Sequence, residues 1–238
     1  MGKISVGIPT RDLRWHWTQC TVGTAESVPE VSEVVVIDDA SPDCVRKLLR
    51  EKTANYSKVK FMENLNRLFP FANKYRVVEN CKEDWVALLD SDNAFDGSYF
   101  SAFLKDMDSH DRNVDILCPS FARPNFNYLA YSGKTICAEN IGQYFDNPMF
   151  FTLLNTGNFV VRKSKYLSSL KGVTGSPIAS DVIFAIYHLL TNGARIYVVP
   201  GMEYQHNIHE GSVYKEYVNQ EPGKTKEVEN LIRSLGRV

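Results

Sequence analysis

The sequence lacks the cysteine pattern of a disulfide-rich or zinc-binding protein. Its 238 residues contain 5 cysteines, an odd number, and no two of them form a CxxC pair. Small secreted scaffolds and structural zinc sites both need cysteines paired at short spacing. We therefore expect reduced thiols, as in a cytosol-like compartment. The cysteines are Cys20, Cys44, Cys81, Cys118 and Cys137.

The chain also lacks a surplus of charge of one sign and a long apolar run. The 27 Lys and Arg against 28 Asp and Glu give a net charge of −1, which offers no general attraction to nucleic acid or anionic membrane. The longest apolar segments, such as VIFAIYHLL, are too short to span a bilayer. The first residues form a strand-like segment without the apolar region of a signal peptide. These absences predict a soluble, cytoplasmic protein with no transmembrane segment and no nucleic-acid partner.

What the sequence does contain is an alternation of apolar, strand-like segments and amphipathic, helix-like segments. The run VVVI at residues 34–37 is apolar at every position, which is typical of a strand buried on both faces of a parallel sheet. Ser41 and Ser180 are predicted to be helix N-caps, and Gly193 to end the second of these helices. The alternation predicts an α/β fold with a mixed, mainly parallel sheet flanked by helices. We expect one domain over residues 1–238.

The predicted elements cover most of the chain. Strands are expected at 3–8, 31–41, 58–64, 85–92, 114–122 and 195–201, helices at 13–27, 41–56, 68–82, 97–110 and 180–193, and a strand leading into a helix at 156–170. Residues 123–150 have weak periodicity and are expected to be irregular, with short strands at most. A polar tail, residues 205–227, precedes a short helix that reaches residue 238.

Carboxylates stand where the apolar segments end. In open α/β sheets, ligands bind outside the carboxyl ends of the strands, so these strand ends are expected to converge on one crevice. Two carboxylates two residues apart are costly unless a cation lies beside them, and a hard divalent cation that holds phosphates is a natural partner. The sequence has no GxxxxGK[ST] loop, so a metal would have to hold a diphosphate. The plain alternative is that the carboxylates only cap helices and end turns. The strand ends are Pro9-Thr10-Arg11, Asp38-Asp39 and Asp90-Ser91-Asp92.

Several segments in a fixed order resemble a known family. ISVGIPT, then VVVIDDAS, then NLNRLFPFANKYRVVENCKEDWVALLDSDN are similar to the nucleotide-binding half of GT-A-fold glycosyltransferases, especially those of family 2. NTGNFVVRKSKY resembles the acceptor-side strand of that family. SDVIFAIYHLLTNGARIYVVPG is similar to its Glu-Asp helix and following strand, and YQHNIHEGS to its terminal metal-binding histidine. The resemblance covers roughly residues 3–213 and implies a nucleotide-binding half, 1–97, and an acceptor-binding half, 98–238, that includes the C-terminal tail.

The resemblance implies a role for individual residues. Thr10 and Arg11 would border the base or ribose, and Asp39, or its neighbour Asp38, would contact the base. Asp90 would approach the ribose or the metal, and Asp92 would bind the metal directly. The nucleotide-binding set is Pro9, Thr10, Arg11, Asp38, Asp39, Arg67, Lys74, Asp90, Ser91 and Asp92. The metal-binding set is Asp90, Asp92, His206 and His209, with His206 preferred because it follows the last strand most directly. Asp181 stands where the family has its catalytic base.

The chain departs from the family pattern at three places. Ser180 replaces the usual Glu before the base, and Asn73-Lys74 replaces the usual Arg-Asn pair, with Arg67 and Arg76 nearby. KGVTGSPIAS stands in place of the usual GGF turn before the acceptor helix. The identity of the basic residue that touches the diphosphate and the acceptor contacts are therefore the least transferable features.

The resemblance implies a metal-dependent glycosyltransferase of the hexosyl or deoxyhexosyl type. The donor would be a UDP-, GDP- or dTDP-sugar, the metal Mn²⁺ or Mg²⁺, and the acceptor a hydroxyl of a glycan or glycoprotein. With Asp181 as the only base, the anomeric configuration would invert. Two alternatives stay open: a non-catalytic carbohydrate- or nucleotide-binding domain on the same scaffold, and a sugar-phosphate nucleotidyltransferase. The protein could act alone or as part of a larger glycan-assembly protein.

Overall fold

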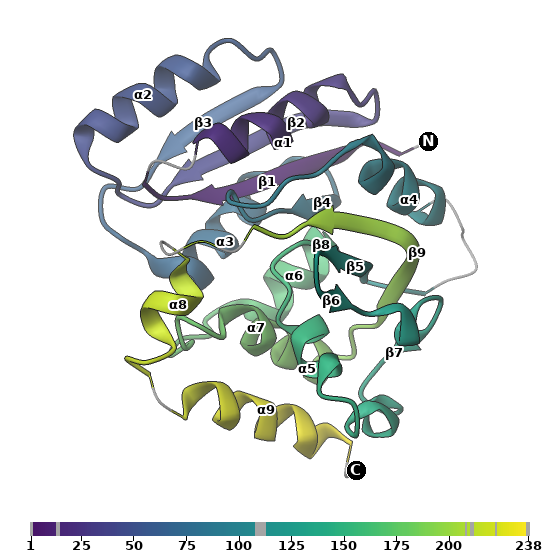
Figure 1. Cartoon of the computed structure of the whole chain (residues 1–238). Helices are drawn as coiled ribbons and strands as arrows, with labels where there is room; N and C mark the ends of the chain where they lie inside the picture. Colours follow the sequence, from purple (N-terminus) through teal and green to yellow (C-terminus); the bar gives the residue numbers. More distant parts are fainter. Residues whose placement is uncertain are drawn as a thin grey trace.

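A computed structural model describes residues 2–12, 15–107, 113–207, 209, 212–221 and 223–236. A central mixed sheet runs through the molecule with helices on its faces, as Figure 1 shows. The strands are β1 (Ile4–Thr10), β2 (Val31–Asp38), β3 (Val59–Glu63), β4 (Trp85–Leu88), β5 (Ile116–Arg123), β6 (Phe126–Asn127), β7 (Thr135–Ile136), β8 (Phe159–Arg162) and β9 (Ile196–Gln205). The α-helices are α1 (Trp15–Ser27), α2 (Asp43–Thr53), α3 (Phe69–Asn80), α4 (Gly97–Met107), α5 (Met149–Leu154), α6 (Lys163–Leu170), α7 (Asp181–Thr191), α8 (Val213–Tyr217) and α9 (Lys224–Leu235), and the 3₁₀ turns are η1 (Leu129–Tyr131) and η2 (Ile141–Tyr144).

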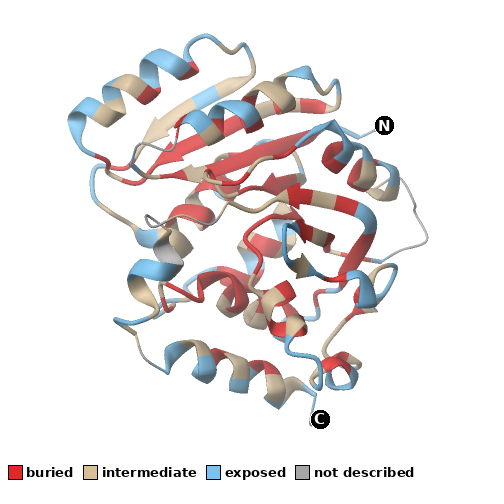
Figure 2. Cartoon of the chain, in the orientation of Figure 1, coloured by how far each residue is buried: buried red, intermediate tan, exposed pale blue. Residues whose placement is uncertain are grey.

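The first half of the sheet is parallel. Its strands lie in the order β3-β2-β1-β4, and every neighbouring pair among them is parallel. The side chains of Val34, Val35, Val36 and Ile37 are fully buried, which confirms the strand predicted from the unbroken apolar run. Helices cover both faces of this half. The chain passes from β1 to β2 to β3 in one direction along the sheet and then returns to form β4 on the other side of β1. Right-handed crossovers therefore place α3 on the face opposite to α1 and α2. Figure 2 shows the resulting buried centre in β1 and β2.

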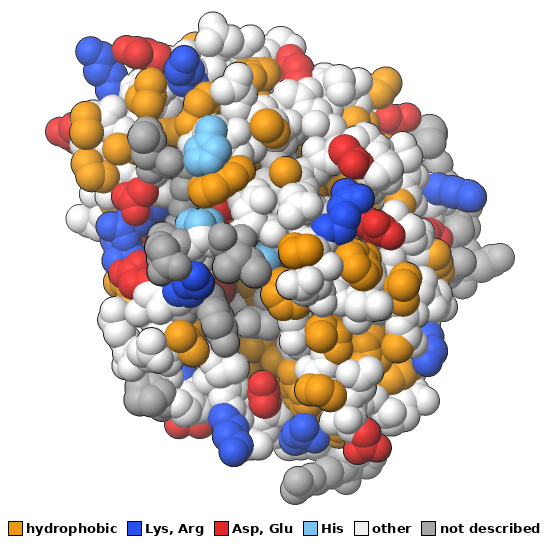
Figure 3. All heavy atoms as spheres, in the orientation of Figure 1, with side chains coloured by type: hydrophobic (Ala, Val, Ile, Leu, Met, Phe, Trp, Pro, Cys, Tyr) orange, Lys and Arg blue, Asp and Glu red, His pale blue; other side chains and the backbone are white. Residues whose placement is uncertain are grey.

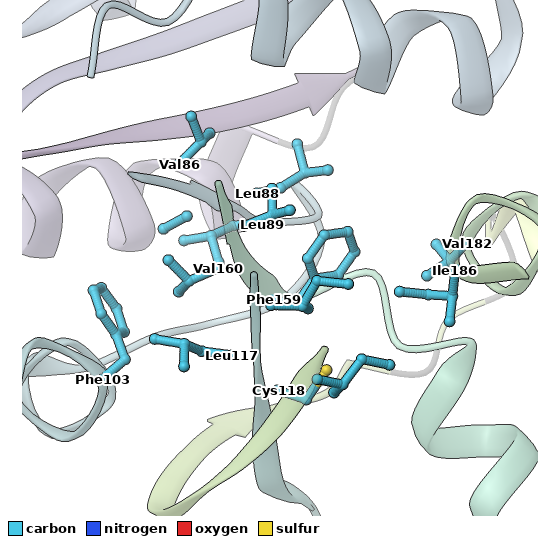
Figure 4. Packing of buried hydrophobic residues seen from close by; sticks show 14 of the residues in the cluster. Val86, Leu88, Leu89, Phe103, Leu117, Cys118, Phe159, Val160, Val182 and Ile186 are labelled. Atoms are coloured by element: carbon cyan, nitrogen blue, oxygen red, sulfur yellow. The ribbon is translucent and has the colours of Figure 1, made fainter. Parts of the chain in front are cut away.

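The second half of the sheet is mixed. β8 lies antiparallel to both β4 and β5, whereas β9 runs parallel to β5 and β7 closes the edge against β9. Because β8 is antiparallel to β4, the start of β8 meets the end of β4, with Phe159 paired to Leu88. Figure 4 shows Phe159 on the side of the sheet that faces Val182 and Ile186 of α7, and Val160 on the opposite side, toward Phe103 of α4. The loop before β8 is thereby brought to the carboxylates that follow β4.

Of the two predicted N-caps, one is wrong and one is confirmed in position. Ser41 does not cap α2, which begins at Asp43; its hydroxyl instead binds the Asp38 carboxylate and accepts a hydrogen bond from the Asp12 amide. Ser180 occupies the N-cap position of α7, as predicted, but its hydroxyl binds Thr225 Oγ1 at 2.5 Å and makes no side-chain capping hydrogen bond. In both cases another side chain takes the hydroxyl that local sequence assigned to a cap.

The remaining predictions concern the 123–150 region, the end of α7, the cysteines and membrane-spanning helices. The 123–150 region contains the short strands β6 and β7, as expected, but the aromatic segment that forms α5 was not predicted as a helix. Gly193 follows α7 with a φ of 77°, as a helix stop requires. The 5 cysteines are free, in agreement with the prediction. No helix in the described part of the chain is long and apolar enough to cross a membrane.

The packing of α3 on β1 gives a first testable prediction. A Cβ atom on Gly7 would lie 2.5 Å from Cγ1 of the buried Val77, whereas a Cβ on Gly23 in α1 meets nothing within 4 Å. Gly7→Ala should lower the free energy of unfolding by about 1–3 kcal/mol through overpacking. Gly23→Ala, the matched control, should raise it by about 0.5–1 kcal/mol, because alanine restricts the unfolded chain and favours helix. Urea denaturation measures both; equal effects of the two variants would contradict the close contact.

Candidate active site

The carboxyl ends of β1, β2 and β4 converge on one cavity of about 570 Å³. Among the residues predicted from sequence, those that line it are Pro9, Thr10, Arg11, Asp39, Arg67, Lys74, Asp90, Ser91, Asp92, Asp181 and His206. Figure 3 shows histidine side chains gathered near the middle of one face of the molecule. The predicted convergence of three strand ends is therefore confirmed. Asp38 and His209 are not part of the cavity lining.

The two adjacent aspartates at the end of β2 have different surroundings. The Asp38 side chain is fully buried, and burial raises the pKa of its carboxyl against the opposing hydrogen bonds from Ser41. The Asp39 carboxylate faces the loop before α3, where it accepts hydrogen bonds from Asn64 Nδ2 at 2.8 Å and from the amides of Leu68 at 2.7 Å and Phe69 at 2.9 Å. Asp38 thus holds its own turn and is not brought to the cavity, while Asp39 lines it.

The loops around this cavity hold strained backbone. Asp12, Ala40 and Phe69 have positive φ angles of 62°, 57° and 66°; the first two lie in the loops after β1 and β2, and Phe69 is the first residue of α3. Such conformations cost about 1–3 kcal/mol each and gather at functional sites. The guanidinium of Arg67 lies 4.3 Å from the centre of the Phe69 ring, so the strained residue also places a cation at the cavity.

Some buried polar atoms of the cavity have no hydrogen-bond partner among the described residues. They include Thr10 Oγ1, Arg11 Nε, Arg67 Nε and His206 Nδ1. Buried polar groups in folded proteins are nearly always satisfied, so exceptions that gather in one cavity favour a polar ligand there.

Lys74 forms the centre of charge in the cavity. Its Nζ lies 2.9 Å from Oδ2 of Asp181 and 3.4 Å from Oδ1 of Asp90. The side chains of Lys74 and Asp181 are only 9% and 10% exposed. Burial alone would lower the pKa of Lys74, but the attraction of both carboxylates raises it, so the ammonium stays charged. Burial raises the pKa of Asp181, and the charge of Lys74 opposes that rise.

The loop before β8 fixes Asp90, a contact that the sequence did not indicate. The Asp90 amide donates to Asn158 Oδ1 at 2.8 Å. A Cβ on Gly157 would lie 2.0 Å from Oδ2 of Asp90, so only glycine leaves room for that carboxylate. The signal that could have found it is Gly157 itself, near the start of the predicted strand, because glycine in a strand often marks a close approach of another group.

Asp92 and His209 form the arrangement most suited to a metal ion. His209 Nε2 lies 3.1 Å from Asp92 Oδ2. Two ligand atoms at about 2.1 Å from one octahedral ion, at right angles, are separated by about 3 Å, so this pair fits a shared divalent cation. No group of three or more His, Cys, Asp or Glu placed to hold a metal occurs within the described ranges.

The other two candidate ligands are placed differently. His206 lines the cavity with its ring against Phe126, at 5.0 Å between centroids, and burial lowers its pKa, which favours the neutral imidazole. Asp90 is engaged by Lys74. The preference for His206 over His209 drawn from sequence finds no support, since the structure gives the contact with Asp92 to His209.

The parallel β3-β2-β1-β4 half, the antiparallel β8 and the carboxylates at the end of β4 define the GT-A fold. The model of the glycosyl transferase family 2 matches residues 5–161, more than half of the chain, and the chain therefore belongs to that family. A search of curated proteins found no match.

Solved structures are similar over almost the whole chain. S. aureus TarS has a TM-score of 0.69 and 17% identity, covering 97% of this chain and 39% of TarS. Residues 1–349 of TarS in complex with UDP-GlcNAc have a TM-score of 0.70 and 19% identity, covering 98% of this chain and 66% of that one. The mannosyltransferase PcManGT from Pyrobaculum calidifontis, in complex with GDP-Man and Mn²⁺, has a TM-score of 0.62 and 12% identity, covering 98% and 69%. The chain thus spans about two fifths of the full TarS chain.

The buried ion pairs of Lys74 give a prediction about stability. Lys74→Met leaves Asp90 and Asp181 beside each other without their cation, and should lower the free energy of unfolding by about 3–5 kcal/mol. Adding Asp181→Asn should recover part of this loss, because it removes one of the two charges left unpaired. Lys224→Met is the matched control: Lys224 pairs with Glu227 at the surface, so its loss should cost less than about 1 kcal/mol. Chemical denaturation of the four proteins decides, and similar losses in both single variants would contradict a stabilising role for Lys74.

Proposed function

We propose that this chain is a metal-dependent glycosyltransferase that moves a sugar from a nucleoside-diphosphate sugar to a hydroxyl of a glycan or glycoprotein acceptor. The observation that carries the proposal is that the cavity at the ends of β1, β2 and β4 brings Asp92, next to His209, together with Asp181 at the start of α7. Membership of family 2 supports transfer of a sugar rather than of a nucleotidyl group.

The residues after the first strands are assigned to the nucleotide. Pro9, Thr10, Arg11 and Asp39 line one end of the cavity, where Thr10 and Arg67 carry the unpartnered polar atoms. TarS was solved with UDP-GlcNAc and PcManGT with GDP-Man, which supports a UDP- or GDP-sugar as donor, with a dTDP-sugar as the third candidate. In this proposal residues 1–97 bind the donor nucleotide, and residues 98–238 bind the acceptor and supply the base.

The chemistry follows from what each group can do. A divalent cation bound to Asp92 and His209 would act as a Lewis acid for the diphosphate, and the imidazole favours Mn²⁺ over Mg²⁺. Lys74, which is paired with Asp90, would supply a fixed positive charge to the leaving group. Asp181 would take the proton of the acceptor hydroxyl as general base. One base and in-line attack by the acceptor invert the anomeric configuration.

Donor binding can be tested without knowing the acceptor. UDP or GDP with Mn²⁺ should raise the melting temperature by about 5–10 °C at a hundred times the dissociation constant, since a ligand that binds only the native state stabilises it. Asp92→Asn should abolish the shift that depends on Mn²⁺. Asp146→Asn, an exposed site outside the cavity lining, should leave it intact. Equal shifts for the two variants would argue against metal binding at Asp92.

The base can be tested once an acceptor is known. Asp181→Asn should lower kcat by about 10²–10⁴-fold and leave the melting shift with UDP or GDP and Mn²⁺ in place. In the wild type, a carboxyl whose pKa is raised by burial loses its proton only at higher pH. The acid limb of kcat/KM should therefore lie above the pH range of an ordinary aspartate and disappear in the variant. An unchanged acid limb in Asp181→Asn would exclude Asp181 as the base.

A further inference from the structure

Helix α1 holds the segment that carries Asp92 through a row of threonines. Thr18 Oγ1 donates to the carbonyl of Ser91 at 2.9 Å, Thr21 Oγ1 to that of Asn93 at 3.3 Å, and Thr24 Oγ1 to that of Phe95 at 3.1 Å. Every third residue of one helix face thus binds every second carbonyl of the segment after β4. Thr18 and Thr21 are fully buried, so these bonds fix the backbone on both sides of Asp92.

The first turn of the same helix also carries the aromatic neighbour of His209. The indole of Trp17 stacks on the imidazole of His209, with 4.8 Å between ring centroids and 30° between ring planes. Nε2 of the same imidazole lies 3.1 Å from Asp92 Oδ2. One helix therefore holds the residues on either side of Asp92 through hydrogen bonds and contacts the His209 ring through Trp17.

The chain before His209 is tied to the same segment. The Asn207 amide donates to Asn93 Oδ1 at 3.0 Å, and Asn207 Nδ2 donates to the Asp92 carbonyl at 2.8 Å. These bonds place the backbone near His209, but they leave the rotation of the imidazole free. Within the described part of the chain, this rotation is limited by the hydrogen bond between His209 Nε2 and Asp92 Oδ2, which a metal ion would replace, and by the stacked ring of Trp17, which an ion would leave in place.

We propose that Trp17 is a positioning residue of the metal site, whose indole holds the His209 imidazole with Nε2 directed at Asp92. A stacked ring loses its rotational freedom on folding rather than on binding the ion, so the ion meets two ligands already in place. Partners that orient a metal-binding histidine typically contribute 10–100-fold to metal affinity. The inference rests on the proposed function, because it needs a metal at Asp92 and His209.

The neighbouring Trp15 supplies a matched control on the same helix turn. Its side chain is buried, with 7% exposed, and it packs against Tyr56 at 6.3 Å rather than on a candidate ligand. Trp15→Phe should therefore lower stability without changing metal affinity. Trp17→Phe keeps an aromatic surface for the imidazole, whereas Trp17→Ala removes it.

The test measures Mn²⁺ binding directly. Free Mn²⁺ is followed by electron paramagnetic resonance as MnCl₂ is added to the full chain with saturating UDP, and separately with saturating GDP. The dissociation constant for Mn²⁺ should rise about tenfold in Trp17→Ala. It should change by less than about twofold in Trp17→Phe and Trp15→Phe. In the His209→Ala background, Trp17→Ala should have no further effect, since the two side chains act as one unit.

The outcomes separate this inference from the proposed function. Mn²⁺ binding in Trp17→Ala at wild-type affinity, or a further loss in the double variant equal to that in the wild-type background, overturns the role of Trp17 and leaves the metal site in place. Failure of the wild type to bind Mn²⁺ with either nucleotide overturns the metal site itself, and the role of Trp17 with it. A melting temperature recorded for each variant shows whether a lost affinity reflects loss of the fold. If Trp17→Ala does not fold, Trp17→Leu replaces it: the Mn²⁺ affinity of Trp17→Leu must then be lower than that of the folded Trp17→Phe variant, which keeps wild-type affinity.

Discussion

The ammonium of Lys74 between Asp90 and Asp181 is the interaction on which the site depends. It joins α3, the end of β4 and the start of α7, which come from both halves of the chain. Isolated buried charges are expensive, so each of these groups is tolerated only because the others are present. The same arrangement requires a glycine at position 157, because a side chain there would meet the Asp90 carboxylate.

This centre has a charge imbalance that bears on the donor. Asp90, Asp92 and Asp181 carry three negative charges when ionised, against the single positive charge of Lys74. A diphosphate beside them would be repelled unless further cations join it. Arg11 and Arg67 line the cavity and can supply positive charge at the nucleotide end. At the other end, a divalent cation between Asp92 and His209 would do so, and this electrostatic need is an argument for the metal that is independent of family resemblance.

The fold separates the rigid and strained parts of the site. The central parallel strands β1, β2 and β4 are mostly buried, while Asp12 and Ala40 in the loops after β1 and β2, and Phe69 at the start of α3, have positive φ. A stable sheet can tolerate such local strain because its own hydrogen bonds are unaffected. The two aspartates before the left-handed Ala40 face different surroundings, Asp38 its own turn and Asp39 the cavity, because successive side chains at the end of a strand point to opposite sides.

The sequence predicted the features that depend on local pattern. The unbroken apolar run at 34–37 and the carboxylates after it were enough to place strands, strand ends and their convergence, because these follow from periodicity and topology. It failed where a side chain binds a partner other than the one that its local pattern suggests. Ser41 and Ser180 have the chemistry of caps, but Asp38 and Thr225 take their hydroxyls. Likewise, no local signal could tell that His209 rather than His206 would reach Asp92, since their positions depend on contacts of the tail with α1.

The extent of the family match divides the site in an informative way. Residues 5–161 contain the strand ends and Lys74, whereas Asp181 and His209 lie beyond them. Beyond them too lie Thr225 and Glu229 of α9, which line the cavity and follow each other by one helical turn. α9 is held by Arg233, whose guanidinium packs over the rings of Phe145 and Phe151. This part of the cavity wall therefore rests on helix packing that the parallel sheet does not share. In the proposed function it would face the acceptor, and it is joined to the proposed base through the contact of Thr225 with Ser180, the residue before Asp181.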